Sequence, residues 1–164
     1  MARISRAEWV ANKKQYDALV FQMFIKDGWS AVTLDRVSTE LGIRKSTLQG
    51  YYPHKDDFMS ALQGKIFPLI APKMDFSGEE QFIESWKTLL KENSMFREVL
   101  MMLITSIINN GGAGPKVRAV LLKLINGLAL TVGEEKARQT VEKCFGTAIF
   151  SIAFNYSSEI RNKP

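Results

Sequence analysis

Polar side chains able to form hydrogen bonds crowd a short run that begins at residue 44. They are Arg44, Lys45, Ser46, Thr47, Gln49 and Tyr51. If the run forms a helix, Leu48 is its inward position and the polar groups face outward. Such a helix can pair with phosphate oxygens or with base edges in a major groove. The chemistry that these residues predict is hydrogen bonding to a nucleic acid.

A helix and a turn precede this run and would position it. Thr33 can accept the free backbone N–H groups at the start of a helix. Apolar residues then recur at helical spacing on one face, at Leu34, Val37 and Leu41. Gly42 can adopt the left-handed conformation that ends this helix. The sequence thus predicts two short helices joined at Gly42, and Pro53 stops the second.

The segment resembles the TetR/AcrR family of bacterial transcriptional regulators. The matching residues are Gly28, Trp29, Thr33, Leu34, Val37, Ser38, Leu41, Gly42, Ile43, Thr47, Leu48, Tyr52, Lys55 and Phe58. Two positions depart from the family pattern. Gln49 stands where the family usually has a tyrosine that touches the DNA backbone, and Ser46 stands where a glycine is common. Gln49 could hydrogen-bond a phosphate or contact adenine through its amide.

The resemblance implies that this segment is a helix-turn-helix that binds DNA. The expected DNA-binding residues are Thr33, Arg44, Lys45, Ser46, Thr47, Gln49, Gly50, Tyr51, Tyr52 and Lys55. Thr33 and Lys55 stand at helix N-termini, where free N–H groups favour phosphate. The expected base readers are Arg44, Lys45, Thr47 and Gln49, of which the first three could contact phosphate instead.

Three positions near the end of the second helix have separate expected roles. Tyr52 matches the family's inward aromatic residue, whereas Tyr51 is freer to reach the DNA backbone. Gly50 either allows close approach of a DNA strand or is simply tolerated near a helix end. Upstream, the N-terminal arm either follows the DNA or forms a solvated basic face, with Arg3, Arg6, Lys13 and Lys14.

Composition and charge agree with a polyanionic partner. The chain has 164 residues, 46% of them hydrophobic, a net charge of +5 and a pI near 9.4. Residues 1 to 55 hold nine Lys or Arg against five Asp or Glu, which is a net +4. The basic excess therefore lies where the resemblance lies.

Several function classes fit the sequence poorly. A single cysteine excludes an internal disulfide, and no apolar run has membrane length, so a cytoplasmic protein without membrane contact is expected. The only histidine, His54, lies 90 positions from Cys144, which argues against a metal site. The glycine-rich run GGAGPK lacks the ending of a phosphate loop. Neither catalysis nor a cofactor is expected.

The expected fold is all-α, in two domains. Residues 1–67 would form a three-helix helix-turn-helix domain with the start of a connecting helix, and residues 68–164 a short helical regulatory and dimerisation domain. A first helix should run from Arg6 or Trp9 to Lys26 with an inner face of Val10, Tyr16, Leu19, Val20, Met23 and Phe24. Further helices are expected from near His54 to Pro68, over 79–92, over roughly 95–110, from Pro115 to about Val132, and from just after Gly133 to about Arg161.

The resemblance gives the second domain two expected tasks. A small-molecule pocket could be lined by Phe82, Trp86, Met95, Phe96, Met101 and Met102, with Phe67 and Phe76 as further candidates. A dimer interface could be formed by Val141, Phe145, Ala148, Ile149, Ile152 and Tyr156. Both sets have an alternative interpretation as ordinary core, because any helical bundle needs apolar residues at this spacing.

The function that the sequence favours is therefore sequence-specific regulation of transcription. A homodimer would bind a palindromic operator as a repressor, and a small apolar inducer would release it. The alternative is a helical adaptor that uses the same motif for contacts with proteins. The operator, the inducer and the choice of repression over activation stay open at the level of sequence.

Overall fold

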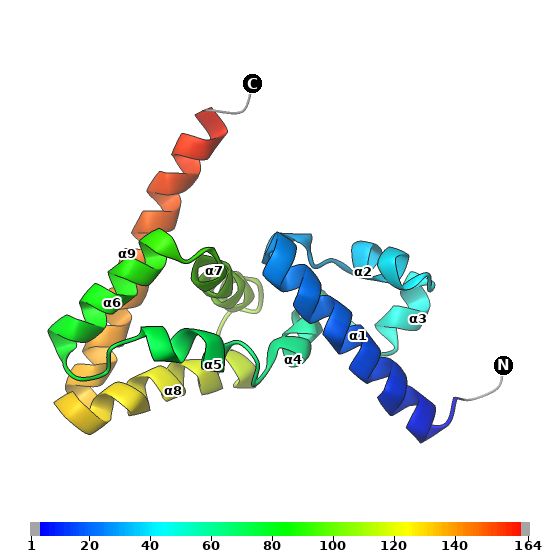
Figure 1. Ribbon diagram of the computed structural model, residues 1–164, viewed down its shortest axis with the longest axis horizontal. Coiled ribbons are helices and arrows are strands. Elements are labelled where there is room, and N and C mark those ends of the chain that lie inside the picture. The colour runs from blue at the N-terminus through cyan, green and yellow to red at the C-terminus, as the bar shows by residue number, and fades with distance from the viewer. Residues whose placement is uncertain (1–3, 162–164) are drawn as a thin grey trace. The chain divides into compact units, whose positions relative to one another are not determined.

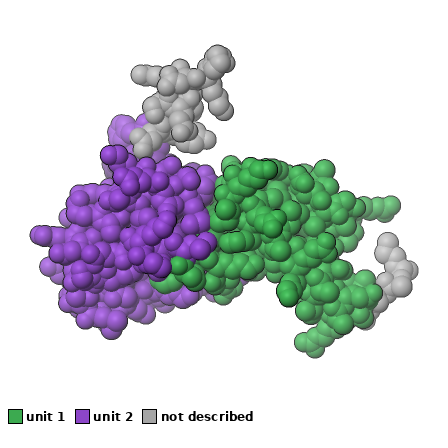
Figure 2. All heavy atoms as spheres, in the orientation of Figure 1, with its two compact units in different colours: residues 1–68 green, residues 69–164 purple. Residues whose placement is uncertain are grey.

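The computed structural model describes residues 4–161, and for residues 155–161 it describes the helical backbone alone. Every regular element in this described part is a helix (Figure 1), so the predicted all-α class is confirmed. By its internal contacts the chain divides into two compact units, Met1–Pro68 and Leu69–Pro164 (Figure 2). None of the described helices is both long and apolar enough to cross a membrane.

Unit 1 begins with the long helix α1, Arg6–Asp27. Ser5 and Glu8 hold its N-terminus by reciprocal hydrogen bonds, which lower the pKa of the Glu8 carboxyl. Gly28 ends the helix with φ 82°. The buried face is Tyr16, Val20, Met23 and Phe24. Val10 differs from the predicted inner face, because it is 55% exposed and no residue of α1 before Tyr16 is buried.

Two short helices follow a single 3-10 turn, η1, Trp29–Ala31. Helix α2 spans Leu34–Leu41, and the Thr33 hydroxyl accepts from the Arg36 N–H at 3.2 Å. Gly42 then takes the left-handed conformation, with φ 65°, that the sequence predicted. Helix α3 spans Lys45–Gln49, two residues shorter at its C-terminal end than expected.

The segment after α3 is more broken than the sequence predicted. Instead of one helix from His54 to Pro68, it holds the 3-10 turn η2, Lys55–Phe58, and the one-turn helix α4, Met59–Leu62. Gly64, with φ 75°, interrupts the chain before α5, Phe67–Ile70, and the 3-10 turn η3, Ala71–Lys73. Phe58, Leu62 and Ile66 are nevertheless buried as expected.

Unit 2 contains four long helices in its described part. They are α6, Glu79–Glu92; α7, Ser94–Asn109; α8, Pro115–Val132; and α9, Glu134–Arg161. Their bounds agree with the predicted ranges to within a residue. Helix α9 packs along α8 and also against α6, while its C-terminal turns extend past the other helices of the unit (Figure 1).

Contacts between distant elements close unit 2 at one end. Lys136 on α9 pairs with Glu79 at the start of α6, at 2.8 Å. Thr131 on α8 donates to the carbonyl oxygen of Phe76 at 2.6 Å. The Phe76 ring also covers Gly127 so closely that a Cβ there would lie 3.1 Å from it. The loop before α6 is thereby fixed to α8.

Candidate nucleic-acid interface

Helix α3 exposes nearly all of its side chains. Leu48 is fully buried, whereas the residues predicted to read bases or to lie beside the DNA are exposed, at Arg44, Lys45, Ser46, Thr47, Gln49 and Gly50. Leu48 therefore anchors a helix whose remaining surface is polar. The exposed groups include a guanidinium, an ammonium, two hydroxyls and an amide, which match phosphate oxygens and base edges.

Lys45 has a partner within the protein. Its Nζ lies 2.9 Å from the Asp35 carboxylate on α2, and both side chains are largely exposed, at 47% and 78%. Exposed pairs of this kind contribute about 0–1 kcal/mol. The ammonium can therefore exchange Asp35 for a phosphate at little cost.

The two residues predicted at helix N-termini are placed differently from each other. Thr33 caps α2 with its hydroxyl oxygen, as expected. Lys55 begins the 3-10 turn η2 rather than an α-helix, and its side chain is half-buried. The Lys55 ammonium lies 5.1 Å from the centre of the Trp29 ring, a cation–π contact that fixes its direction.

Tyr51 is less free than the sequence suggested. Its ring stacks on Trp9 at 5.1 Å and meets the edge of Tyr16 at 4.9 Å. Its hydroxyl oxygen accepts from the Asn12 amide at 3.1 Å. Burial, with a smaller effect of Tyr51, raises the pKa of Tyr16. Tyr51 thus joins the end of α3 to the first turns of α1.

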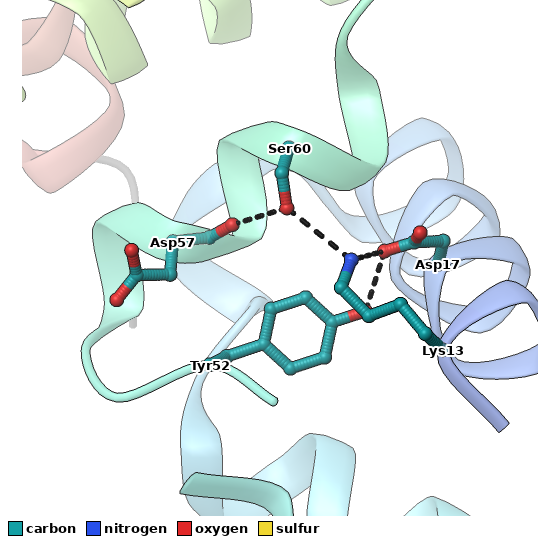
Figure 3. A network of polar contacts seen from close by, with 5 residues as sticks. All are labelled: Lys13, Asp17, Tyr52, Asp57 and Ser60. Atoms are coloured by element: carbon teal, nitrogen blue, oxygen red, sulfur yellow. Dashed lines mark hydrogen bonds and ion pairs between the residues drawn. The ribbon is translucent and has the colours of Figure 1, made fainter. Parts of the chain in front are cut away.

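Tyr52 is fully buried and does not reach the surface, in contrast to its place among the predicted DNA contacts. Its ring packs against Phe58 at 4.6 Å, and its hydroxyl donates to Asp17 Oδ1 at 2.5 Å (Figure 3). Burial raises the pKa of the Tyr52 hydroxyl well above its usual range, and the bond to Asp17 adds to this effect. Tyr52 therefore supports α3 from the buried side of this helix.

Lys13 completes the polar network around Tyr52. Its ammonium contacts Asp17 at 2.5 Å, the Ser60 hydroxyl at 3.4 Å and the face of the Tyr52 ring at 4.4 Å (Figure 3). Ser60 in turn donates to the Asp57 carbonyl at 2.7 Å. The network ties α1, the end of α3 and α4 together, so the position of α3 is fixed by side chains from three elements.

The basic residues predicted for the N-terminal arm lie in different surroundings. Arg6 and Lys14 are exposed, Lys13 points into the network, and Arg3 lies outside the described residues. Sequence reasoning missed Asp17 and Ser60. The signal that could have indicated this network is the helical spacing of Lys13 and Asp17, which lie on the same face as Val20 and Phe24. A charged pair on a buried helical face predicts a partly buried network.

The predicted pocket residues of unit 2 form an aromatic cluster with their neighbours. Phe82, Trp86, Phe96 and Met102 are buried, while Met95 and Met101 are half-buried. The Trp86 ring lies 6.0 Å from Phe82, 4.9 Å from Phe96 and 5.3 Å from Phe145. Phe76 joins through Phe82 at 5.3 Å, whereas Phe67 belongs to unit 1.

The predicted dimer stripe on α9 is divided by the structure. Val141 and Ala148 are buried within the subunit, and Phe145 contacts Trp86, so this part of the stripe is core. Ile152 is half-buried, Ile149 is 51% exposed, and the Tyr156 side chain lies outside the described residues. Larger exposed apolar groups on α8 and α9 are Leu130 at 91%, Phe150 at 67% and Phe154 at 71%.

Comparison with known families identifies the class of protein. The sequence profile described as the tetracycline repressor LuxT C-terminal domain matches residues 63–152, which is more than half of the chain. The chain belongs to the TetR family and is a transcriptional regulator. Within that family, its second unit is of the LuxT type. A comparison with curated proteins gave no match. The matched range does not include α2 and α3, so their chemistry rests on their own residues.

Proposed function

We propose that this regulator binds a palindromic DNA operator as a homodimer, with α3 of each copy in a major groove. The observation that carries the proposal is the surface of α3, where exposed polar residues surround one buried anchor, Leu48. The network behind Tyr52 supports the proposal, because base recognition requires a reading helix held in a defined position.

The contacts would divide by position on unit 1. Arg44, Thr47 and Gln49 are exposed and would reach base edges. Lys45 would reach the DNA after leaving Asp35. Lys55, directed by Trp29, and the N-cap hydroxyl of Thr33 would hold phosphates.

A homodimer follows from the small size of the reading helix. One helix of five residues covers only a few base pairs, and two-fold symmetry places a second copy on the next half-site, about 34–36 Å away. The surface that would meet the second copy is the exposed apolar face of α9, which includes Ile149, Phe150 and Phe154. Exposed apolar groups gathered on one helix favour an interface between proteins.

Gly146 supports this face as the contact between copies. It lies within the 28-residue helix α9, one turn before Phe150, and its Cβ would meet no heavy atom within 4 Å apart from its chain neighbours and the backbone of its own helix. Glycine inside a helix costs about 1 kcal/mol relative to alanine. Packing within the subunit does not require this glycine, whereas close approach of a second helix would.

The regulator would act as a repressor, since a dimer that occupies a promoter blocks polymerase without further contacts. A small molecule bound in unit 2 would release it by favouring a conformation in which the two α3 helices no longer match the groove spacing. Both statements extend what is usual for the family to this chain.

Selection of binding sites from random duplex DNA with purified protein tests the proposal. We expect an inverted repeat whose half-site spacing corresponds to one helical turn or a multiple of it. Arg44→Ala should lose the enrichment, while Lys116→Ala, which removes an exposed positive charge from α8, should retain it. A protein that enriches no sequence and shows no salt-dependent, saturable binding to duplex DNA would instead be an adaptor.

A further inference from the structure

Trp86 carries a polar group that the packing of unit 2 does not use. The residue lies in the middle of α6 and is 1% exposed, surrounded by rings from α6, α7 and α9. Its indole Nε1 is buried and has no hydrogen-bond partner, alone in this respect among the side-chain atoms of the described residues. Burying a donor without an acceptor destabilises the folded state.

Packing of the ring does not require the indole N–H donor at this position. A phenylalanine at position 86 would keep an aromatic ring against Phe82, Phe96 and Phe145 without the unpaired donor. Buried polar groups are nearly always satisfied in native proteins, so an unpaired one marks a place where an acceptor is expected. The unpaired group lies within the predicted ligand region of unit 2.

The surroundings define the chemistry of the missing acceptor. An indole N–H only donates, so its partner must carry an acceptor such as a carbonyl oxygen. The rings that contact Trp86, those of Phe82, Phe96 and Phe145, are apolar. The charged residues Glu84 and Lys87, which are close to Trp86 in sequence, are exposed and paired with each other at 2.8 Å. A charged ligand would therefore lose its hydration without compensation at the cluster.

We propose that Trp86 donates its indole N–H to the carbonyl oxygen of a neutral, mainly apolar ligand bound at this cluster. The inference rests on the proposed function, because it names the class of molecule to which the regulator would respond. Met95 and Met101 are half-buried on the helix that carries Phe96, and their flexible thioether side chains would allow this helix to repack around such a molecule.

The test compares three probes of similar size by NMR of the ¹⁵N-labelled full chain. Acetophenone is neutral and has one carbonyl, ethylbenzene lacks the oxygen, and benzoate is charged. We expect acetophenone to move the Trp86 indole proton downfield and to bind about threefold to tenfold more tightly than ethylbenzene. Benzoate should leave the signal in place. Trp9 and Trp29 provide internal reference signals, and Trp86→Phe identifies the resonance by its loss.

Two variants keep the test independent of stability. In Trp86→Phe, the preference for acetophenone over ethylbenzene should disappear in a thermal-shift titration. Phe96→Leu keeps the donor, removes one ring and should retain the preference. This variant is measured as well because Trp86→Phe could fail to fold. Equal responses to acetophenone and ethylbenzene, or no response to either, would overturn the proposal. So would a Trp86 proton already hydrogen-bonded in the free protein, for example to buried water.

DNA binding is measured in the same samples, so the two proposals can fail separately. If the wild-type chain binds an operator while its Trp86 signal ignores acetophenone, only the ligand assignment fails. If the signal responds but no operator is found, the ligand site stands and the DNA-binding proposal fails.

Discussion

At the scale of residues, two of the proposed DNA contacts have opposite signatures. Lys55→Ala should weaken binding to all duplexes alike and lower the slope of log affinity against log salt by about one unit. Gln49→Ala should instead change the preference at one or two base positions, by about 1–3 kcal/mol. Fluorescence anisotropy over a salt series, with a panel of operator variants, measures both. If Lys55→Ala altered discrimination while the slope stayed constant, its assignment to phosphate would fail.

The adjacent tyrosines provide a matched pair for stability. Tyr52→Phe removes a buried donor to the Asp17 carboxylate and should lower the free energy of unfolding by about 1.5–3 kcal/mol, the range for bonds to charged groups. Tyr51→Phe removes an acceptor for the neutral Asn12 amide and should cost only about 0.5–1.5 kcal/mol. Urea unfolding compares them. A smaller loss of unfolding free energy in Tyr52→Phe than in Tyr51→Phe would show that the network does not stabilise the folded state.

Cys144 gives a prediction that depends on pH. Burial raises the pKa of its thiol to about 11. At pH 8 only about one molecule in a thousand then carries the reactive thiolate. Alkylation of the native protein by iodoacetamide should therefore be far slower than alkylation in urea, and should accelerate as the pH rises toward 11. Rapid reaction of the native thiol at pH 8 would contradict the burial.

At the scale of elements, two glycines inside helices should respond in opposite ways to the same substitution. The Cβ of Gly146→Ala would meet no atom within 4 Å beyond its chain neighbours and its own helix backbone, and the variant should stabilise α9 by about 1 kcal/mol. Gly127→Ala brings a Cβ to 3.1 Å from the Phe76 ring and should destabilise α8 by about 1–3 kcal/mol, the usual cost of overpacking. Thermal unfolding at low protein concentration distinguishes the two.

The same pair tests the proposed contact between copies. If α9 of a second copy packs closely on Gly146, the alanine variant should dissociate at higher protein concentration than wild type in analytical ultracentrifugation. Gly127→Ala serves as the control, because its clash lies within the subunit. An unchanged association constant for Gly146→Ala would remove that face from the interface.

Local signals made the elements of unit 2 predictable. Pro115 at the start of α8, Gly133 before α9 and the acidic first turn of α6 each mark a boundary that depends on neighbouring residues alone. The segment between His54 and Pro68 was not predicted, because its apolar spacing is helical although Gly64 has a positive φ. The spacing of apolar residues indicates which face of a segment is buried, but it does not indicate whether the segment forms one continuous helix.

At the scale of the whole molecule, the candidate site was predictable in its exposed part and unpredictable in its support. The outward residues of α3 follow from one buried position, Leu48, and from the residue types around it. The support of Tyr51 and Tyr52 comes from Trp9, Asn12 and Asp17, which lie 35 or more positions away. A periodic pattern holds no information on such pairs. For the same reason, it could not separate the core side of α9 from its exposed side.

The pairing of Lys45 with Asp35 would have a consequence for how the proposed regulator searches along DNA. The Asp35 carboxylate pairs with the Lys45 ammonium as a phosphate would, so each encounter with DNA would begin by displacing this carboxylate. Arg36 and Lys13 are held by Asp27 and Asp17 in the same manner. Fewer counterions would then be released than the number of basic residues suggests, and affinity for random sequence would fall modestly, because each exposed pair contributes only about 0–1 kcal/mol. Such internal competition would shorten the time spent at wrong sites and leave selectivity to the proposed hydrogen bonds of α3.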